Sequence, residues 1–343
     1  MESQDKLVGL QAWLAGELGL VAPLRVDRIA GGLSNVTSVV EDGAGRRVVV
    51  RRPPHGRAGG GAHDVLREAR IIAALAGNVP VPAVLGTCAD PDVAGWPFYV
   101  MAFAPGRVLD STDAAKEIPK AQRRALGFEF MAVLARLHAA DLDRIGLADL
   151  RRRTPYAQRQ LRRLGEQWRA TTDRDVPAME HVAKRLGELA GRLGPDPAVL
   201  VHGDFRFGNA MVQAGPPGGA ARITALLDWE LTTTGHPLAD LGFLAARMQA
   251  PKEVLLSDAE PSSVPGYPTL EELAGHYHEH TGVPLADLPF FTALNVWRWA
   301  VIVEGIQRRL ARGEMGESDE NAAWHRRRVE ILAEFAESLL TNQ

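Results

Sequence analysis

The sequence is poor in cysteine and lysine, and it carries no large excess of charge of either sign. Its single cysteine, Cys88, cannot form an internal disulfide or a cysteine zinc cluster, so we interpret it as a small buried apolar residue. Lys and Arg together number 39 and Asp and Glu 42, which gives a net charge of -3. Because a protein that binds a phosphate backbone normally has a basic excess, nucleic acid is not an expected partner.

Long apolar runs are also missing. Residues 1–20 are charged early and show helical spacing, which is not typical of a secretory signal. The longest apolar stretch near the C-terminus, 293–306, is interrupted by Asn295, Arg298 and Glu304 and is too short to span a bilayer. These features predict a cytoplasmic protein with no membrane partner.

The composition that remains is that of a chain with a substantial core. The 343 residues are 46% hydrophobic and 24% charged, which favours two domains or one large two-lobed unit. Only five of the 39 basic residues are lysine, and none lies between Lys6 and Lys116. Any cation that is needed in that part of the chain must therefore be arginine or histidine.

The first 103 residues predict an antiparallel sheet packed on a helix. Short apolar segments alternate with Gly-rich turns, and residues 64–77 show helical spacing with Asp64 as the expected N-cap. The expected strands are residues 24–29, 35–41, 47–52, 83–89 and 98–103. After the turn at Pro105 and Gly106 the pattern becomes mostly helical.

The second predicted unit, 104–343, is interrupted by two short apolar runs. AVLVHGD and ITALLDWE, at 198–204 and 223–230, each end in acidic residues at an expected junction of strand and loop. That placement exposes carboxylates at the rim of a site. The sequence therefore predicts an α+β fold with a sheet-rich lobe at 1–103 and a mainly helical lobe at 104–343.

The strongest chemical signal is HGDFRFGN at 202–209, followed by DWE at 228–230. Asp204, Asn209 and Asp228 supply one base and two oxygen ligands. Phosphoryl transfer from a nucleoside triphosphate needs a carboxylate that orients the attacking hydroxyl and hard oxygen donors for Mg²⁺. The alternative is that these acids only cap strands and tie loops, but their order and strand context favour a site.

With these motifs the chain resembles the aminoglycoside phosphotransferase family, small-molecule kinases that share the protein-kinase-like fold. The resemblance runs from Gly31 to Asp240 and is most specific in HGDFRFGN and LLDWE. The segments GGLSNVTSVV, VVVRRPP, FYVMAFAPG and TTGHPLADLGF are similar to the branch found alone or fused to acyl-CoA dehydrogenases. The resemblance implies ATP and Mg²⁺ between two lobes, with Asp204 as catalytic base and Asn209 and Asp228 as Mg²⁺ ligands.

Other polar residues of these motifs have open roles. Arg206 could offset charge on the transferring phosphoryl group or be held by a neighbouring acid, and we weight the two equally. Glu230 could reach a second metal, whereas Asp240 is expected to anchor the backbone of the catalytic loop. His202 is expected to hold that loop by hydrogen bonding rather than to catalyse.

The turn before residue 36 is a candidate phosphate contact. Gly31 and Gly32 would let backbone N–H groups approach phosphates, and Ser34 and Asn35 complete the turn, with Ser34 able to add a donor. Gly-Gly at a hairpin is by itself more often only a tight turn. The presence of HGD and DWE favours phosphate contact.

Kinase-like lobes usually place a lysine on the third strand, paired with a glutamate on the next helix, and this chain has none there. Strand alternation allows only one of Arg51 and Arg52 to face the cleft, and the resemblance favours Arg51 with Glu68 as its partner. Arginine is permanently charged and bidentate but bulkier than lysine. The resemblance also implies that backbone groups near Met101 to Phe103 meet the adenine edge.

The acceptor is less well defined. Around Trp297 the C-terminal region carries Arg298 rather than gathered carboxylates, which favours an anionic or neutral small-molecule hydroxyl acceptor over a polycationic one. The resemblance suggests a hydroxyacyl-CoA or related acid and a functional link to an acyl-CoA dehydrogenase. The alternatives are a non-catalytic nucleotide-binding module, prompted by the missing lysine, and an aminoglycoside- or macrolide-modifying kinase. His276 and His280 have metal-like spacing, but we interpret them as part of a surface helix.

Overall fold

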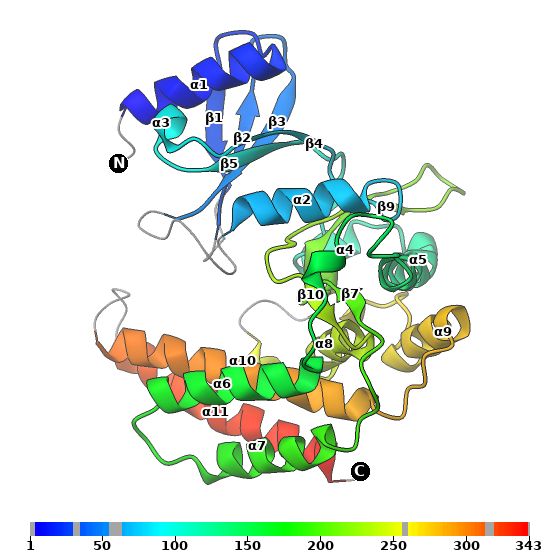
Figure 1. Ribbon diagram of the computed structural model, residues 1–343. Coiled ribbons are helices and arrows are strands. Elements are labelled where there is room, and N and C mark those ends of the chain that lie inside the picture. Colours follow the sequence, from blue (N-terminus) through cyan, green and yellow to red (C-terminus); the bar gives the residue numbers. More distant parts are fainter. Residues whose placement is uncertain (1–3, 30–34, 55–63, 256–259, 313–318, 342–343) are drawn as a thin grey trace.

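The computed structural model describes residues 4–29, 35–54, 64–255, 260–312 and 319–341 (Figure 1). A five-stranded antiparallel sheet with the order β1-β2-β3-β5-β4 forms the N-terminal part. Its strands are β1 (Arg25–Arg28), β2 (Val36–Glu41), β3 (Arg47–Arg52), β4 (Val84–Cys88) and β5 (Phe98–Ala102). The predicted sheet is confirmed, with each strand shorter than or equal to its expected range.

Alternation along β3 decides what each face of the sheet contacts. Val48 and Val50 pack in one cluster with Leu14 of α1 (Gln4–Leu18), whereas Val49 packs on the opposite side in the cluster that contains Ile72 of α2 (Val65–Leu75). Successive strand side chains point to opposite faces, so Arg51 lies on the α2 face. The short helix α3 (Pro91–Ala94) lies beside α1 (Figure 1).

Helix α2 begins where the sequence predicts. The Asp64 side chain accepts a hydrogen bond from the Arg67 N–H at 2.9 Å, which satisfies a donor that the first turn leaves unpaired. Glu68, one turn further on, is buried although it is charged. This cap fixes the helix register and thereby turns Glu68 toward β3.

The C-terminal part is mainly helical and carries two small sheets. Its helices are α4 (Thr112–Lys116), α5 (Lys120–His138), α6 (Tyr156–Thr171), α7 (Pro177–Ala190), α8 (Leu238–Gln249), α9 (Leu270–Thr281), α10 (Leu288–Ala311) and α11 (Asp319–Leu340). The strands are β6 (Arg107–Val108), β7 (Val199–Val201), β8 (Ala210–Gln213), β9 (Arg222–Leu226) and β10 (Thr233–Gly235). Strand β10 pairs with β7, and β6, β8 and β9 form the other sheet.

The two parts meet along α2, β4 and the hairpin of β8 and β9. The Leu226 N–H donates to the Pro80 carbonyl at 2.7 Å, and Arg70 forms an exposed ion pair with Asp149. The division at residue 103 stays a prediction, although it falls next to the end of β5 at Ala102. No helix among the described residues is long and apolar enough to cross a membrane.

Candidate active site

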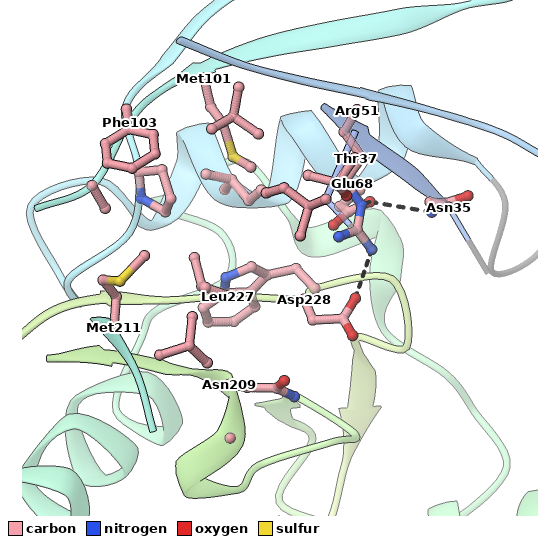
Figure 2. A pocket seen from close by; sticks show the side chains of 18 of the residues that line it. Asn35, Thr37, Arg51, Glu68, Met101, Phe103, Asn209, Met211, Leu227 and Asp228 are labelled. Atoms are coloured by element: carbon pink, nitrogen blue, oxygen red, sulfur yellow. Dashed lines mark hydrogen bonds and ion pairs between the residues drawn. The ribbon is translucent and has the colours of Figure 1, made fainter. Parts of the chain in front are cut away.

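A cavity of about 730 Å³ lies between the five-stranded sheet and the hairpin of β8 and β9. Val49 and Met101 line it on the sheet side. Met211 and Leu227 line it on the hairpin side, across the cavity from Met101 (Figure 2). Apolar side chains on opposite walls leave a slot that suits a flat heteroaromatic ring. The cavity thus has the shape and lining of a small-molecule site.

The segment that leaves β5 forms one edge of this cavity. Met101 and Phe103 line it, together with Ala102 and Ala104, and their contact with an adenine edge stays a prediction. The Ala102 N–H donates to the Ala83 carbonyl at 2.8 Å, so this amide is already used. A base edge would have to be read by other backbone groups of the segment.

Arg51 is the central cation of the site. Its Nε lies 3.0 Å from Glu68 Oε2, and its Nη2 lies 2.6 Å from Asp228 Oδ1 (Figure 2). The same Nη2 lies 3.2 Å from Glu230 Oε2. The Arg51 side chain is 12% exposed and that of Glu68 2%. One guanidinium therefore joins the third strand, the first helix after it and the DWE motif.

Arg52 points the other way. It is buried on the α1 side, where its guanidinium carbon lies 4.7 Å from the centre of the Trp96 ring and its Nη1 donates to the Pro53 carbonyl. The structure thus places Arg51, and not Arg52, at the cleft with Glu68.

Burial dominates the electrostatics of the pair. It raises the pKa of Glu68 from 4.5 to about 7, against the lowering effect of Arg51, and Asp228 and Glu230 raise it further. The neighbouring Tyr99 hydroxyl is fully buried, and its pKa is raised well above the ordinary value, chiefly by desolvation. The carboxylates raise the pKa of Arg51 despite its desolvation, so it stays charged.

A pH dependence of folding follows from Glu68. The pKa of Glu68 is about 7 in the folded chain and 4.5 in the unfolded reference. The stability that this raised pKa contributes is therefore complete below pH 4.5 and is lost as pH rises through about 7. The free energy of unfolding of wild type relative to Glu68→Gln should therefore fall between about pH 5 and about pH 8. Urea titrations of both chains measure this difference. The control is Glu334→Gln at an exposed position of α11, for which no such change with pH is expected. If the difference in unfolding free energy between wild type and Glu68→Gln did not depend on pH, the raised pKa of Glu68 would be contradicted.

Asn35 and Glu230 complete the carboxylate cluster. The Asn35 Nδ2 donates to Glu68 Oε2 at 3.5 Å and to Glu230 Oε2 at 3.3 Å. Asn35 thus contributes a side-chain brace in the described structure. Gly31, Gly32 and Ser34, also predicted for phosphate contact, lie outside the described residues.

The catalytic-loop candidate places Asp204 beside Asn209. The Asn209 Nδ2 donates to both the Asp204 backbone carbonyl and its Oδ2, each at 2.8 Å. The Leu227 N–H donates to the Asn209 carbonyl at 2.8 Å, which brings Asp228 next to Asn209. The three residues predicted to converge are therefore adjacent, although Asp204 itself is not among the residues that line the cavity.

His202 and Asp240 hold this loop, as the sequence predicts. The His202 ring lies 3.0 Å from the Leu227 carbonyl through Nε2, and its Nδ1 accepts from the Asp204 N–H. The fully buried Asp240 carboxylate accepts the N–H groups of His202 and Gly203 at 2.7 and 2.8 Å and contacts His138. Gly203 has φ +86°, and a Cβ there would lie 2.7 Å from the Leu231 carbonyl oxygen. The loop backbone is thus fixed by buried contacts.

Arg206 satisfies part of each interpretation. Its Nε lies 3.5 Å from Asp204 Oδ2, and its side chain also lines the cavity. The Arg206 guanidinium lies over Gly208, in the space that a Cβ there would occupy. Arg206 is placed where it could face both the acid and a bound phosphate.

The donor set fits a hard divalent cation. The two hydrogen bonds of Asn209 Nδ2 orient the amide and leave its Oδ1 as a free acceptor, while Asp228 keeps one oxygen that Arg51 does not contact. Amide and carboxylate oxygens are ligands that Mg²⁺ accepts. Asp228 has φ +66°, a left-handed conformation rare for a non-glycine residue and frequent at functional sites. The residues present therefore suit Mg²⁺.

Two features lie outside the sequence-based interpretation. Arg298, singled out only as a substrate candidate, donates from Nη1 to the Gly203 carbonyl at 3.0 Å. On α9, Glu279 lies with His276 and His280, and one ligand atom of each is within 4.8 Å of the others. Glu279 was missed as a member of that group, although its spacing from His276 could have shown it.

This combination of a small antiparallel lobe, a helical lobe and a carboxylate-rich cleft is the protein-kinase-like phosphotransferase fold. A solved protein from Ralstonia eutropha, which carries the provisional designation aminoglycoside phosphotransferase, superposes with a TM-score of 0.77 at 29% identity and covers 97% of this chain and 98% of its own. The GDP complex of aminoglycoside 2'-phosphotransferase-IIIa shares the fold, with a TM-score of 0.63 at 16% identity over 98% of this chain and 99% of its own.

Family membership rests on the sequence comparisons. The model of the phosphotransferase enzyme family matches residues 25–273, and the chain belongs to that family. Acyl-CoA dehydrogenase family member 10 of Mus musculus is 32% identical over 97% of this chain, and family member 11 of Gallus gallus is 35% identical over 91%. The chain spans 31% and 40% of the lengths of these two relatives.

Proposed function

We propose that the protein is a Mg²⁺-dependent phosphotransferase that moves the γ-phosphate of ATP to a hydroxyl of a small molecule. The observation that carries the proposal is that Asp204, Asn209 and Asp228 lie next to one another, with Asn209 and Asp228 lining the cavity. Membership of the phosphotransferase family and the nucleotide bound in the GDP complex of a protein with the same fold support it. The preference for ATP over GTP comes from the resemblance alone.

Each side chain has a defined task in this proposal. Asn209 and Asp228 would hold Mg²⁺, which supplies charge neutralisation on the phosphates. Asp204 orients the acceptor hydroxyl and takes its proton, a role in which positioning matters more than basicity because the transition state is loose. Arg206 is placed to offset charge on the transferring group, and Arg51, held by Glu68, to bind phosphate oxygens.

The acceptor we propose is a hydroxyacyl-CoA or a related hydroxy acid. Support comes from the names of the curated relatives, which are acyl-CoA dehydrogenase family members, and a functional link to such a dehydrogenase is part of the proposal. An antibiotic acceptor is the second candidate, because a solved neighbour of the same fold is an aminoglycoside phosphotransferase. Transfer of label from γ-labelled ATP to a metabolite pool, compared with aminoglycosides and macrolides, separates the two.

Removal of the proposed metal ligands should change nucleotide binding more than folding. With Asn209→Ala or Asp228→Asn we expect the increase in ATP affinity that Mg²⁺ causes in wild type to fall sharply, because the first variant removes an oxygen ligand and the second removes the negative charge of the other ligand. Calorimetric titration of ATP with and without Mg²⁺ measures this. Asp110→Asn, at another wall of the same cavity, is the matched control. Mg²⁺-dependent binding in both ligand variants at the wild-type level would refute their roles.

A further inference from the structure

Five arginines gather around the backbone that leads into and out of the catalytic loop. They come from α2, from the loop before α6, from α6 itself and from α10. We call them the arginine belt: Arg67, Arg152, Arg159, Arg163 and Arg298. None of them is among the residues that line the nucleotide cavity, so their charge serves some other part of the protein.

Members of the belt contact neutral backbone groups. Arg67 Nη2 donates to the Thr232 carbonyl and Arg159 Nη2 to the Thr234 carbonyl, each at 2.5 Å. These acceptors lie on the segment that runs from the DWE motif into β10, which pairs with β7 directly before the loop. Arg298 donates to the carbonyl of Gly203, the residue before Asp204. A carbonyl satisfies a donor but leaves the positive charge uncompensated.

Arginines nearby on the same elements behave differently. Arg70, one turn after Arg67, pairs with Asp149, and Arg151, next to Arg152, pairs with Asp143. Within the described part of the chain, no carboxylate lies within ion-pair distance of any belt member. The acids that act on Arg67 from further away are Asp64, whose side chain accepts the Arg67 N–H, and Asp149, which already pairs with Arg70. The acid that acts on Arg159 is Asp196, which accepts the Tyr156 N–H.

The belt members also act on one another. Burial lowers the pKa of Arg163, and Arg298 lowers it further; burial likewise lowers that of Arg67, and Arg152 adds to the effect. Arg159 and Arg163 lie in the first two turns of α6, where the helix dipole adds positive potential. Like charges gathered without partners raise the free energy of the ligand-free protein, and an anion would relieve that repulsion.

We propose that the arginine belt is the subsite for an anionic group of the phosphate acceptor, a phosphate or a carboxylate carried on the same molecule as the reacting hydroxyl. The proposal rests on the proposed function and names its substrate class. Its position follows from Arg298, whose carbonyl partner belongs to the residue before the proposed base. An acceptor whose anion reaches Arg163 and Arg298 would have its hydroxyl delivered toward Asp204, and guanidinium groups suit both anions because they bind oxygen pairs in a fork.

Binding of coenzyme A and of a short hydroxy acid by calorimetry tests the subsite without any turnover. In Arg163→Gln and Arg298→Gln we expect the affinity for the probe that binds the arginine belt to fall by about tenfold or more, because each variant loses a charge-assisted hydrogen bond. In wild type we expect binding of that probe to weaken as salt is added. The controls are Arg162→Gln, the next residue on α6, and Arg309→Gln on the exposed end of α10. The melting temperature of each variant is measured as well, so that a loss of anion binding can be separated from a loss of folding.

The choice of probe distinguishes the two anions. Coenzyme A tests a phosphate source, the hydroxy acid tests a carboxylate source, and the diol of the same carbon chain lacks any anion. The hydroxy acid, its coenzyme A thioester and the diol are then compared as phosphate acceptors with ATP. For the two anionic acceptors, Arg163→Gln should have a higher KM than wild type and the same kcat. For the diol, both constants should equal those of wild type.

Three results would overturn the proposal: wild type that binds neither anion, affinities equal in wild type and both belt variants, or a KM change equal for diol and anion. Loss of thermal stability without loss of anion binding would show that the arginines only brace β10. Failure of the kinase proposal is a separate result, since it would appear as absent Asp204-dependent transfer while belt-dependent anion binding persists.

Discussion

Replacement of Asp204 by Asn is expected to lower the turnover of phosphoryl transfer by about 10²- to 10⁴-fold, the usual contribution of a positioned general base. Asn has the shape of Asp and keeps an oxygen that can accept the hydrogen bond from Asn209 Nδ2. The loop and the nucleotide site should therefore survive while the proton acceptor is lost. The effect is measured as the steady-state rate of nucleoside diphosphate release in the presence of an acceptor that the wild-type protein phosphorylates.

Two controls make this result specific. The exposed carboxylate Asp287 at the start of α10, changed to Asn, should leave turnover unchanged. Calorimetric affinity of Asp204→Asn for Mg²⁺-ATP should match wild type, because the proposed ligands are Asn209 and Asp228. Turnover close to wild type would eliminate Asp204 as the base, whereas absence of transfer in wild type itself would favour the alternative of a non-catalytic nucleotide-binding module.

Replacement of Arg51 by Ala is expected to destabilise the folded chain by about 3–5 kcal/mol, the usual effect of removing one partner from a buried ion pair. Glu68 is 2% exposed, and without Arg51 it would either keep an unpaired charge beside Asp228 and Glu230 or take up a proton, and both cost free energy at neutral pH. Urea unfolding at neutral pH measures the loss. Affinity for ATP should fall in the same variant, since the proposed phosphate contact disappears.

A second substitution tests the cause. Glu68→Gln added to Arg51→Ala should recover part of the lost stability, because a neutral amide costs less to bury than an unpaired carboxylate. Arg107→Ala, which breaks the exposed ion pair with Glu117, serves as the control and should cost about 1 kcal/mol or less. A loss that small for Arg51→Ala would contradict the role of Arg51 as a buried bridge.

Local patterns explain why much of the site could be predicted. Strand alternation across 47–52 and helical spacing after Asp64 are enough to place Arg51 opposite Glu68, because both depend on neighbours along the chain. The order of HGDFRFGN and DWE likewise predicts that Asp204, Asn209 and Asp228 converge. The sequence also predicts that His202 and Asp240 support this loop.

Contacts between segments that are far apart in the sequence could not be predicted. Glu230 accepts from Arg51 although 179 positions separate them, and Arg298 meets Gly203 across 95. Such contacts depend on how the helical part packs against the loop. The sequence of α10 by itself is typical of an ordinary buried helix. The phosphate role of Gly31, Gly32 and Ser34 stays a prediction, as does the division at residue 103.

Asp204, the proposed proton acceptor, and Arg51, which bridges the carboxylates, belong to different parts of the molecule. Asp204 is held through Asn209 and, by way of its neighbours, Asp240, all within the helical half, whereas Arg51 reaches Asp228 from the sheet. A hinge-like opening would separate Arg51 from Asp228 and leave Asp204 in register with Asn209. In the proposed reaction, we expect product to leave and the next nucleotide to enter after the loss of these ion pairs, while the hydrogen bond between Asn209 and Asp204 stays intact.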